Sequence, residues 1–434
     1  MEGVQNIFKI PELKKRIFFA FALLGVYRIG VHVPTPGIDA HALSAFFANN
    51  QNTLLGFFDM FSGGAFSRLT VFALGIMPYI SSSIILDLLT VVFPYLDKLK
   101  KEGEQGRKKL TQYTRYGTVV LSSIQGFGIS FALEAMRGPA GDLVVPSPGW
   151  GFRLMTVLTL TAGTAFIMWL GEQITERGIG NGISLIIFVG IVARLPLAVD
   201  QTLSQMGVGE RSIFETLFLV VLMVLVIFLI IFMEAGHRRI PIQYAKRVVG
   251  RKMYGGQSTH LPLKLNTSGV IPPIFASSVI MFPATIASFA PLPWMKTFSN
   301  NLFPGTMIYT LFYVGLVFFF CYFYTAIVFN PSDVAENMRK YGGFVPGIRP
   351  GKKTSEYLDK ILTRLTFVGA IYLSAITILP DYLIKYFNVP FYFGGTGLLI
   401  VVGVAMDTMQ QVESHLVMRH YESFIKKGRL RGRR

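Results

Sequence analysis

Ten long apolar stretches constrain the fold of this chain more than any other feature of its sequence. They lie at about 17–33, 69–93, 116–136, 154–170, 183–199, 213–233, 265–290, 307–329, 361–379 and 394–409. A helix of about 20 mostly apolar residues crosses the ~30 Å hydrocarbon core of a membrane. Because 52% of the 434 residues are hydrophobic and only 15% are charged, there is too little polar surface for two or three water-soluble domains. The sequence therefore predicts an all-α polytopic membrane protein with ten transmembrane helices.

The distribution of Lys and Arg predicts how these helices are oriented. Most of the 41 Lys and Arg residues fall in loops on one side, namely 1–16, 94–115, 171–182, 234–264, 330–360 and 410–434. An excess of Lys and Arg marks the cytoplasmic side of a membrane protein. We therefore expect both termini in the cytoplasm, which agrees with an even number of crossings. The remaining positive charge would attract anionic lipid or an anionic partner.

The predicted spans divide into two halves of five. Residues 1–200 hold spans one to five, residues 211–411 hold spans six to ten, and residues 412–434 form a basic cytoplasmic tail. An odd number of spans gives the halves opposite orientations, which is the topology of an inverted repeat with a pathway between the halves. Residues 54–68 are apolar but too short to span, so they favour a re-entrant or interfacial segment on the external side.

Three of the spans are distinguished by their polar residues, and two of the loops by their length. Spans two, five and seven are rich in Gly, Pro, Ser or Asn, which is tolerated where a helix lines a cavity or meets another helix. The cytoplasmic loops 234–264 and 330–360 are much longer than a simple turn requires, and both contain Gly-Gly and Pro. They are either solvated loops with the usual positive charge or ordered hairpins that dock a negatively charged partner.

The sequence contains no recognisable catalytic, metal or cofactor site. Cys321 is the only cysteine, and the six histidines are scattered without a metal-binding pair. The segment 347–354 lacks the spacing of a phosphate-binding loop, and 178–182 does not follow a strand as a dinucleotide fingerprint does. We therefore expect neither an enzyme nor a cofactor. A ten-span secondary transporter for a small solute is the rival class, and it predicts a compact polar site at the midplane with a coupling ion.

Seven segments spread from end to end carry a resemblance to one known family. They are Arg28–Ile38, Asp59–Ile85, Glu176–Ile187, Tyr244–Pro262, Gly269–Thr285, Phe344–Gly351 and Phe391–Val401. Together they resemble the SecY family, the central subunits of the bacterial protein-conducting channel. The resemblance implies two inverted five-helix halves that form a clamshell around an hourglass pore, with a short external re-entrant plug helix. It also implies that unfolded secretory polypeptides cross the bacterial cytoplasmic membrane there and that hydrophobic segments leave sideways into lipid.

The resemblance assigns six isoleucines to a pore ring. Without the resemblance they would be ordinary apolar residues of membrane helices. They are Ile76, Ile80, Ile183, Ile187, Ile274 and Ile400. Ile76 and Ile80 are four residues apart, as are Ile183 and Ile187, so each pair would share one face of a helix. An apolar ring excludes ions by dewetting, and aliphatic side chains can flex around any polypeptide without preferring one sequence.

A plug and a lateral gate are implied by the same resemblance. The plug comprises Phe57, Phe58, Asp59, Met60, Phe61, Ser62, Gly63, Gly64, Ala65, Phe66, Ser67 and Arg68. It would close the resting pore from outside. The gate would be formed by spans two and three against seven and eight, with Ser81, Gln125 and Asn266 as its polar positions. Ordinary helix packing is the alternative for these three residues.

Partners also follow from the resemblance. Arg247, Arg251 and Lys252 on one long loop and Arg349 on the other match positions that contact the SecA motor ATPase and the ribosome in turn. Ribosomal RNA is anionic, so this docking would weaken as salt rises. Because no catalytic residues are present, the driving energy would come from the motor or the translating ribosome. Small membrane subunits of the SecE and SecG types, signal peptides, nascent chains and membrane lipids are the other expected partners.

Overall fold

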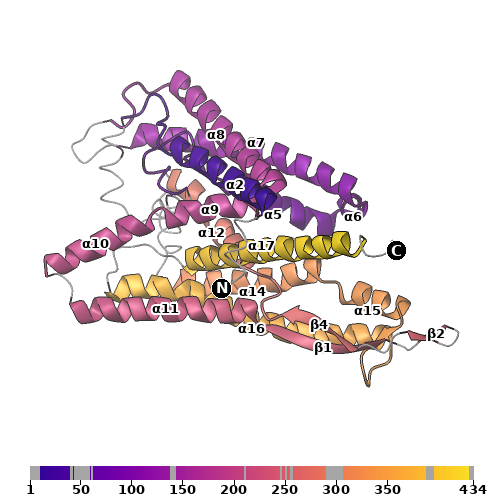
Figure 1. The fold of residues 1–434 in the computed structure, drawn as a ribbon. Helices are drawn as coiled ribbons and strands as arrows, with labels where there is room; N and C mark the ends of the chain where they lie inside the picture. Colours follow the sequence, from indigo (N-terminus) through magenta and orange to yellow (C-terminus); the bar gives the residue numbers. More distant parts are fainter. Residues whose placement is uncertain are drawn as a thin grey trace.

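The protein is mostly helical (Figure 1). The computed structural model describes residues 10–39, 43, 59, 62–136, 143–209, 212–244, 247–249, 252–254, 258–289, 306–387 and 395–429. The helices that correspond to the predicted spans are α2 (Pro11–Gly30), α5 (Met77–Val92), α7 (Glu104–Ala135), α8 (Trp150–Arg177), α9 (Gly182–Val192) with α10 (Leu195–Gly207), α11 (Ile213–Ala235), α12 (Ile271–Phe289), α14 (Met307–Val328), α16 (Lys352–Phe387) and α17 (Gly395–Arg429). Two further helices, α6 (Pro94–Lys101) and α15 (Pro331–Lys340), lie in the predicted loops.

Length and hydropathy support most of these helices as membrane spans. In the described residues, six helices are long and apolar enough to cross a membrane, and the bent pair of α5 and α6 would make a seventh. The other predicted spans correspond to α2, α12 and α17, whose apolar parts are shorter or adjoin charged turns. The helices α7, α16 and α17 extend well beyond the predicted apolar windows, because their polar ends continue as helix outside the apolar stretch.

The helices form two groups, as the two predicted halves require (Figure 1). Contacts link α2, α5, α7, α8 and α9 into one group, and α11, α12, α14, α16 and α17 into the other. The groups meet where α9 contacts α17 and where α12 contacts α5 and α7. The second and seventh spans of the sequence therefore lie at the boundary between the halves.

The second predicted span begins later than its hydropathy indicates. Helix α5 starts at Met77, whereas the apolar run starts at Leu69. The residues between them form turns that attach just beyond the C-terminal end of α2, where the Val71 N–H donates to the Val33 carbonyl at 3.0 Å. Gly75 has a φ of +56°, which ordinary residues avoid and which separates these turns from the helix. An apolar run alone could not reveal this, because buried turns and buried helix have the same composition.

The long loop 234–264 is an ordered hairpin, as one of the two readings of the sequence predicted. Strand β1 (His237–Tyr244) pairs antiparallel with β4 (Ser258–Lys264), and β5 (Gly343–Phe344) from the second long loop pairs with β1 on its other side. Strands β2 (Arg247–Val249) and β3 (Lys252–Tyr254) form a separate small sheet at its tip. Ile240 and Ile242 of β1 pack on Leu358 and Leu362 of α16 in a small core. These strands are an exception to the predicted all-α fold.

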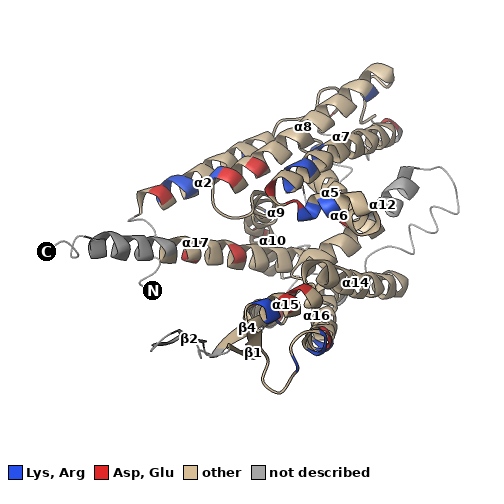
Figure 2. Cartoon of the chain, turned by 90° about the vertical axis from the view of Figure 1, so that its right-hand side faces the viewer, with Lys and Arg blue, Asp and Glu red and all other residues tan. Residues whose placement is uncertain are grey.

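Charged side chains gather at the end of the molecule that carries this sheet. Figure 2 faces that end and shows Lys and Arg around α6 and α15. Helix α6 turns by 103° from α5 and ends with Lys98, Lys100 and Lys101. The hydrogen bond from the Lys101 ammonium to Asp97, at 2.7 Å, raises the pKa of Lys101. Two loops distant in sequence thus present basic surface on the same end of the molecule.

Candidate functional site

The six predicted ring isoleucines meet in one apolar cluster. They come from α5 (Ile80, with Ile76 as its N-cap residue), α9 (Ile183 and Ile187), α12 (Ile274) and α17 (Ile400). Ile76, Ile187 and Ile400 are 2–4% exposed, and the other three pack against them half-buried. Both groups of helices contribute, so the cluster lies on the boundary between the halves. Aliphatic side chains offer neither a proton nor a hydrogen bond, so what this arrangement can do is exclude water and ions.

Glycines at the α8–α9 turn bring the ring residues of α9 close to α8. A Cβ on Gly182 would clash with the carbonyl of Gly171, so only glycine permits this approach. Asn181 starts α9 by accepting hydrogen bonds from the Ile183 N–H at 3.1 Å and the Ser184 N–H at 3.3 Å. The Gly180 N–H donates to the Gln411 side chain of α17 at 3.0 Å. The glycine-rich segment therefore positions α9 against both its own half and the other.

The predicted plug is described at Asp59 and from Ser62 onward, while Phe57, Phe58, Met60 and Phe61 lie outside the described residues. Asp59 is helical, but Ser62 to Arg68 run in turns, so this part of the expected plug helix is not helical. The Asp59 carboxylate accepts from the Ser67 N–H at 2.7 Å, and the Ser62 hydroxyl donates to the Asp59 carbonyl at 3.1 Å. The segment is thus closed on itself by its own polar groups.

The predicted plug lies against the six ring isoleucines. Ala65 is fully buried in the same apolar cluster as Ile76 and Ile187. Its neighbour Phe66 is buried in a second cluster with Leu69. The only exposed residue among Ser62–Arg68 is Arg68. The described part of the plug therefore packs as core rather than as a surface loop.

Polar contacts fasten the plug to two elements that the sequence did not single out as a site. The Tyr27 hydroxyl of α2 donates to the Ser62 carbonyl at 3.4 Å, and the Arg28 guanidinium donates to the Gly63 carbonyl at 3.3 Å. Arg194, between α9 and α10, forms an ion pair with Asp59. A signal was present, because Arg194 is a charged residue within a predicted span, and such residues are usually functional.

A pair of glycines permits the plug to approach α9. Gly63 has a φ of +66°, and a Cβ added to it would lie 2.9 Å from the Cα of Gly190 on α9. Gly64 also has a left-handed φ of +91°, and a Cβ there would lie 3.5 Å from the Arg194 guanidinium. A Cβ at Gly63 would have to displace Gly190, and at Gly64 the left-handed φ alone favours glycine, so the close approach of the two backbones depends on Gly63.

The predicted gate residues lie near the boundary between the halves but do not bond to one another. Asn266, in the turn before α12, donates to Glu234 at the end of α11 at 2.6 Å and to the Gly269 carbonyl at 3.0 Å. Both partners belong to its own half. Ser81 on α5 and Gln125 on α7 are half-buried, and neither has a side-chain hydrogen bond to another described residue. The three residues thus do not form a polar bridge across the boundary in this structure.

The predicted docking residues lie on the basic end. Arg349 is exposed, and its carbonyl accepts from the Thr354 hydroxyl at 2.9 Å near the start of α16. Arg247 and Lys252 begin β2 and β3 in the small tip sheet, and Arg251 lies outside the described residues. The backbone therefore places Arg247 and Lys252 in the small sheet at the tip of the hairpin, and β5 joins the second loop to the end of β1 nearest that tip.

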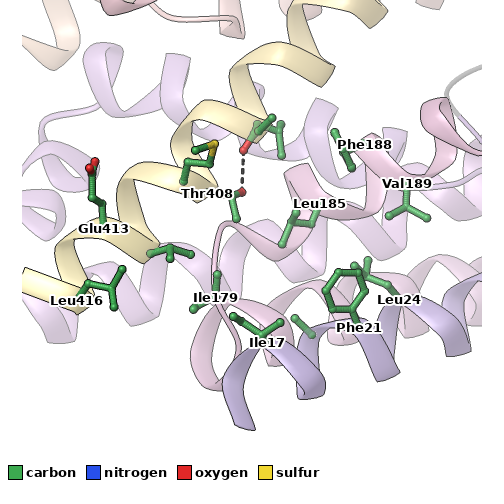
Figure 3. A pocket seen from close by; sticks show the side chains of 15 residues that line it. Ile17, Phe21, Leu24, Ile179, Leu185, Phe188, Val189, Thr408, Glu413 and Leu416 are labelled. Carbon is green, nitrogen blue, oxygen red and sulfur yellow. Dashed lines mark hydrogen bonds between the residues drawn. The ribbon is translucent and has the colours of Figure 1, made fainter. Parts of the chain in front are cut away.

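An apolar groove of about 610 Å³ opens between α2, α9 and α17 (Figure 3). Its lining includes Phe21 and Leu24 of α2, Phe188 of α9 and Val404 of α17, and Glu413 is its one charged residue. Figure 3 shows Phe21, Phe188 and Glu413 arriving from three separate helices. A groove this apolar has no donor set for a small polar solute or a metal ion, and no group of three or more His, Cys, Asp or Glu residues that could hold a metal occurs in the described residues.

Two solved structures share this fold. One, titled the structure of a protein conducting channel, has a TM-score of 0.66 at 15% identity and covers 95% of this chain and 97% of its own. The other, Sec61 in the canine ribosome-channel complex from the endoplasmic reticulum, has a TM-score of 0.60 at 14% identity with the same coverage. At such identities the likeness establishes the architecture alone.

Sequence relatives extend the likeness to nearly the whole chain. The chain is 53% identical over 427 residues to the protein translocase subunit SecY of Escherichia coli strain K12, covering 98% of this chain and 96% of that one. It is 47% identical over 439 residues to the subunit of the same name from Thermotoga maritima, covering 100% of both. The family model for SecY matches residues 70–409. The chain therefore belongs to the SecY family.

Proposed function

We propose that this chain is the pore-forming subunit of a protein-conducting channel in the bacterial cytoplasmic membrane. In this role it passes unfolded secretory polypeptides outward and releases hydrophobic segments sideways into lipid. The observation that carries the proposal is the convergence of six isoleucines from four helices of both halves into one apolar cluster. An aliphatic ring suits a substrate of arbitrary sequence, because it can deform around a chain without a specific hydrogen bond.

The plug and the gate take their expected roles in this proposal. Residues 57–68 close the resting pore from outside, which the burial of Ala65 beside the ring supports. The contacts of α12 with α5 and α7 support a lateral gate there, with Ser81, Gln125 and Asn266 as its polar positions. A single hydrogen bond between helices in lipid contributes on the order of 0.6–2 kcal/mol, so such a seam can open for a competing hydrophobic segment.

Energy comes from partners that dock on the basic end. Arg247, Arg251, Lys252 and Arg349 serve the SecA motor ATPase and the ribosome, which engage in turn. The paired hairpin strands and the exposure of Arg349 support this assignment, because they hold positive charge clear of the membrane spans. Docking on ribosomal RNA through such contacts is sensitive to salt. No step on this chain requires a cofactor or a catalytic residue.

The remaining organisation follows the same proposal. Residues 1–200 and 211–411 act as two halves that separate, and residues 412–434 form a tail in the cytoplasm together with the N-terminus. Small membrane subunits of the SecE and SecG types bind this chain within the membrane. The apolar groove between α2, α9 and α17 supports one such contact, because its lining suits a membrane helix and it touches both halves.

Reconstitution tests the proposal against the transporter alternative. The chain is purified with the subunits that accompany it, inserted into vesicles and given a secretory precursor with the motor and ATP. Protease-protected precursor inside the vesicles is the expected result, together with small one-span or two-span subunits in the preparation. A lone chain that accumulates a small solute and protects no precursor would instead establish the transporter class.

A further inference from the structure

The plug carries a buried charge that the pore proposal does not use. The Asp59 side chain is only 10% exposed, and that of Arg194 is 36% exposed. A carboxylate in such a place is costly unless it is paired and hydrogen-bonded. One Asp59 oxygen accepts from the Ser67 N–H and the other pairs with Arg194, so both oxygens are satisfied. The ion pair joins two segments that are far apart in the sequence.

The position of Arg194 indicates to which half of the molecule the ion pair holds the plug. Arg194 is the N-cap residue of α10, at the bend where α9 ends, and α9 carries the ring residues Ile183 and Ile187. The other described polar contacts between plug and spans come from Tyr27 and Arg28 of α2. Both α2 and α9 belong to the N-terminal half. Among the described residues, the plug is linked to α12 and α17 of the other half through the shared apolar cluster and through no polar contact.

We propose that Asp59 and Arg194 form an ionic latch that fastens the plug to the N-terminal half, so that widening the ring and releasing the plug are separate steps. The proposal rests on the channel function given above. When the halves part, apolar contacts to α12 and α17 separate without breaking an ion pair. The plug stays with α2 and α9 until the Asp59–Arg194 pair breaks. Arg194 is therefore a positioning residue for the plug and not a residue that touches the translocating chain.

Thiol labelling of the plug in the full translocon tests this directly. Cys321 is the only natural cysteine and is buried, so a Ser67→Cys variant offers one new, half-buried thiol. A membrane-impermeant maleimide added from outside reports how often the plug opens in native membranes. We expect Arg194→Met and Asp59→Asn each to raise the labelling rate roughly tenfold, which corresponds to about 1.4 kcal/mol of lost latch energy. The double variant should label no faster than either single one.

A matched control separates the latch from a general loss of ion pairs. Arg153 and Glu134 form an ion pair of similar burial between α8 and α7, with side chains 20% and 11% exposed, away from the plug. Arg153→Met should leave the labelling of Ser67→Cys unchanged. When the two charges are exchanged, as Asp59→Arg with Arg194→Asp, the thiol of Ser67→Cys should be labelled more slowly than in either charge-reversed single variant. An unchanged labelling rate in Arg194→Met would overturn the latch. So would a double variant whose labelling rate rises by the product of the two single effects.

Protein recovery and transport keep the two proposals distinguishable. Translocon yield and export of a precursor with an intact signal are measured in every variant, so that a loss of assembly or of transport is distinguished from release of the plug. If labelling responds as expected but the parent chain transports no precursor, then the channel function fails while the ion pair still holds the segment. If transport is normal and labelling does not respond, then the latch fails and the channel function stands.

Discussion

The ring and the plug seat lie side by side and share apolar packing, yet only the plug seat adds directional polar contacts to it. The ring brings together six aliphatic side chains from four helices. The plug seat uses an ion pair, two side chains of α2 and a pair of facing glycines. Apolar contact is non-directional, so the ring can close around any chain or upon itself. Polar contact is directional, so the plug has one resting place. In the proposed channel, the apolar ring accepts a polypeptide of any sequence, and the polar contacts of the seat define the closed state.

Of the changes that separate the ring from the plug seat, deleting residues 57–67 should have the largest effect, which is on the resting ion leak. The change removes the external closure entirely and leaves the ring as the only barrier, so the resting ion leak should rise while some translocation persists. Single-channel recordings on the reconstituted complex measure the leak, and export of a normal precursor measures the remaining function. A resting pore as tight as the parent's would mean that the ring alone provides the closure.

Placing a polar side chain in the ring should produce the next largest effect. Ile400→Asn or Ile274→Asn introduces an amide with unmet hydrogen bonds, worth on the order of 1–3 kcal/mol, and favours a hydrated constriction. Export of a reporter with a defective signal sequence should therefore increase. Ile400→Leu is the control, because a volume-conserving change usually costs under about 1.5 kcal/mol and brings no water. Unchanged or reduced export in both Asn variants would contradict the ring assignment.

Filling the glycine contact should disturb the seat and spare the ring. Gly63→Ala puts a Cβ 2.9 Å from the Gly190 Cα and forces a left-handed φ on alanine, which costs about 1–2 kcal/mol before the clash is counted. We expect faster labelling of a cysteine at Ser67 and a modest increase in leak. Gly207→Ala is the matched control, because an added Cβ there meets nothing within 4 Å. Equal behaviour of the two variants would argue against close contact at Gly63.

Reversing charge on the basic end should have the smallest effect and should leave both ring and seat intact. Arg349→Glu or Arg251→Glu should weaken motor-driven transport and ribosome binding, without changing membrane topology. Binding by the parent chain should also fall as salt rises, because exposed charges are screened beyond about 8–10 Å at physiological ionic strength. Partner affinity at low and high salt, with topology mapped in parallel, measures this. If both variants bind both partners normally, then these charges serve only to set the orientation of the chain in the membrane.

Hydropathy was a good guide to the helices and a poor guide to their ends. Each predicted span has a helical counterpart, because burying a backbone in lipid requires internal hydrogen bonds whatever the neighbouring sequence. The start of α5 was misplaced by eight residues, from Leu69 to Met77, because apolar turns pack there against α2. The small sheet was likewise only partly foreseen, since the pairing of β5 with β1 joins residues about a hundred positions apart.

The candidate site likewise contains residues that the sequence indicated and contacts that it did not. The ring residues were assigned through the family resemblance, and the structure brings all six together. Asn266 was assigned in the same way, yet its hydrogen bonds go to Glu234 and Gly269 within its own half. Arg194 was visible only as a charge inside a span. Nothing in the sequence pointed to Asp59 as its partner, because pairing depends on how the plug folds back between α2 and α9.

By itself, the sequence determined that this chain is a polytopic helical membrane protein, which of its loops carry the positive charge, and which family it resembles. Those properties depend on composition, periodicity and motifs, which are local along the chain. Only the tertiary structure decided which polar groups meet, that Asp59 pairs with Arg194, and that both long loops share one sheet. These properties depend on contacts between distant segments, and a short-range interaction such as the Asp59–Arg194 pair exists only where the packing brings the two residues together.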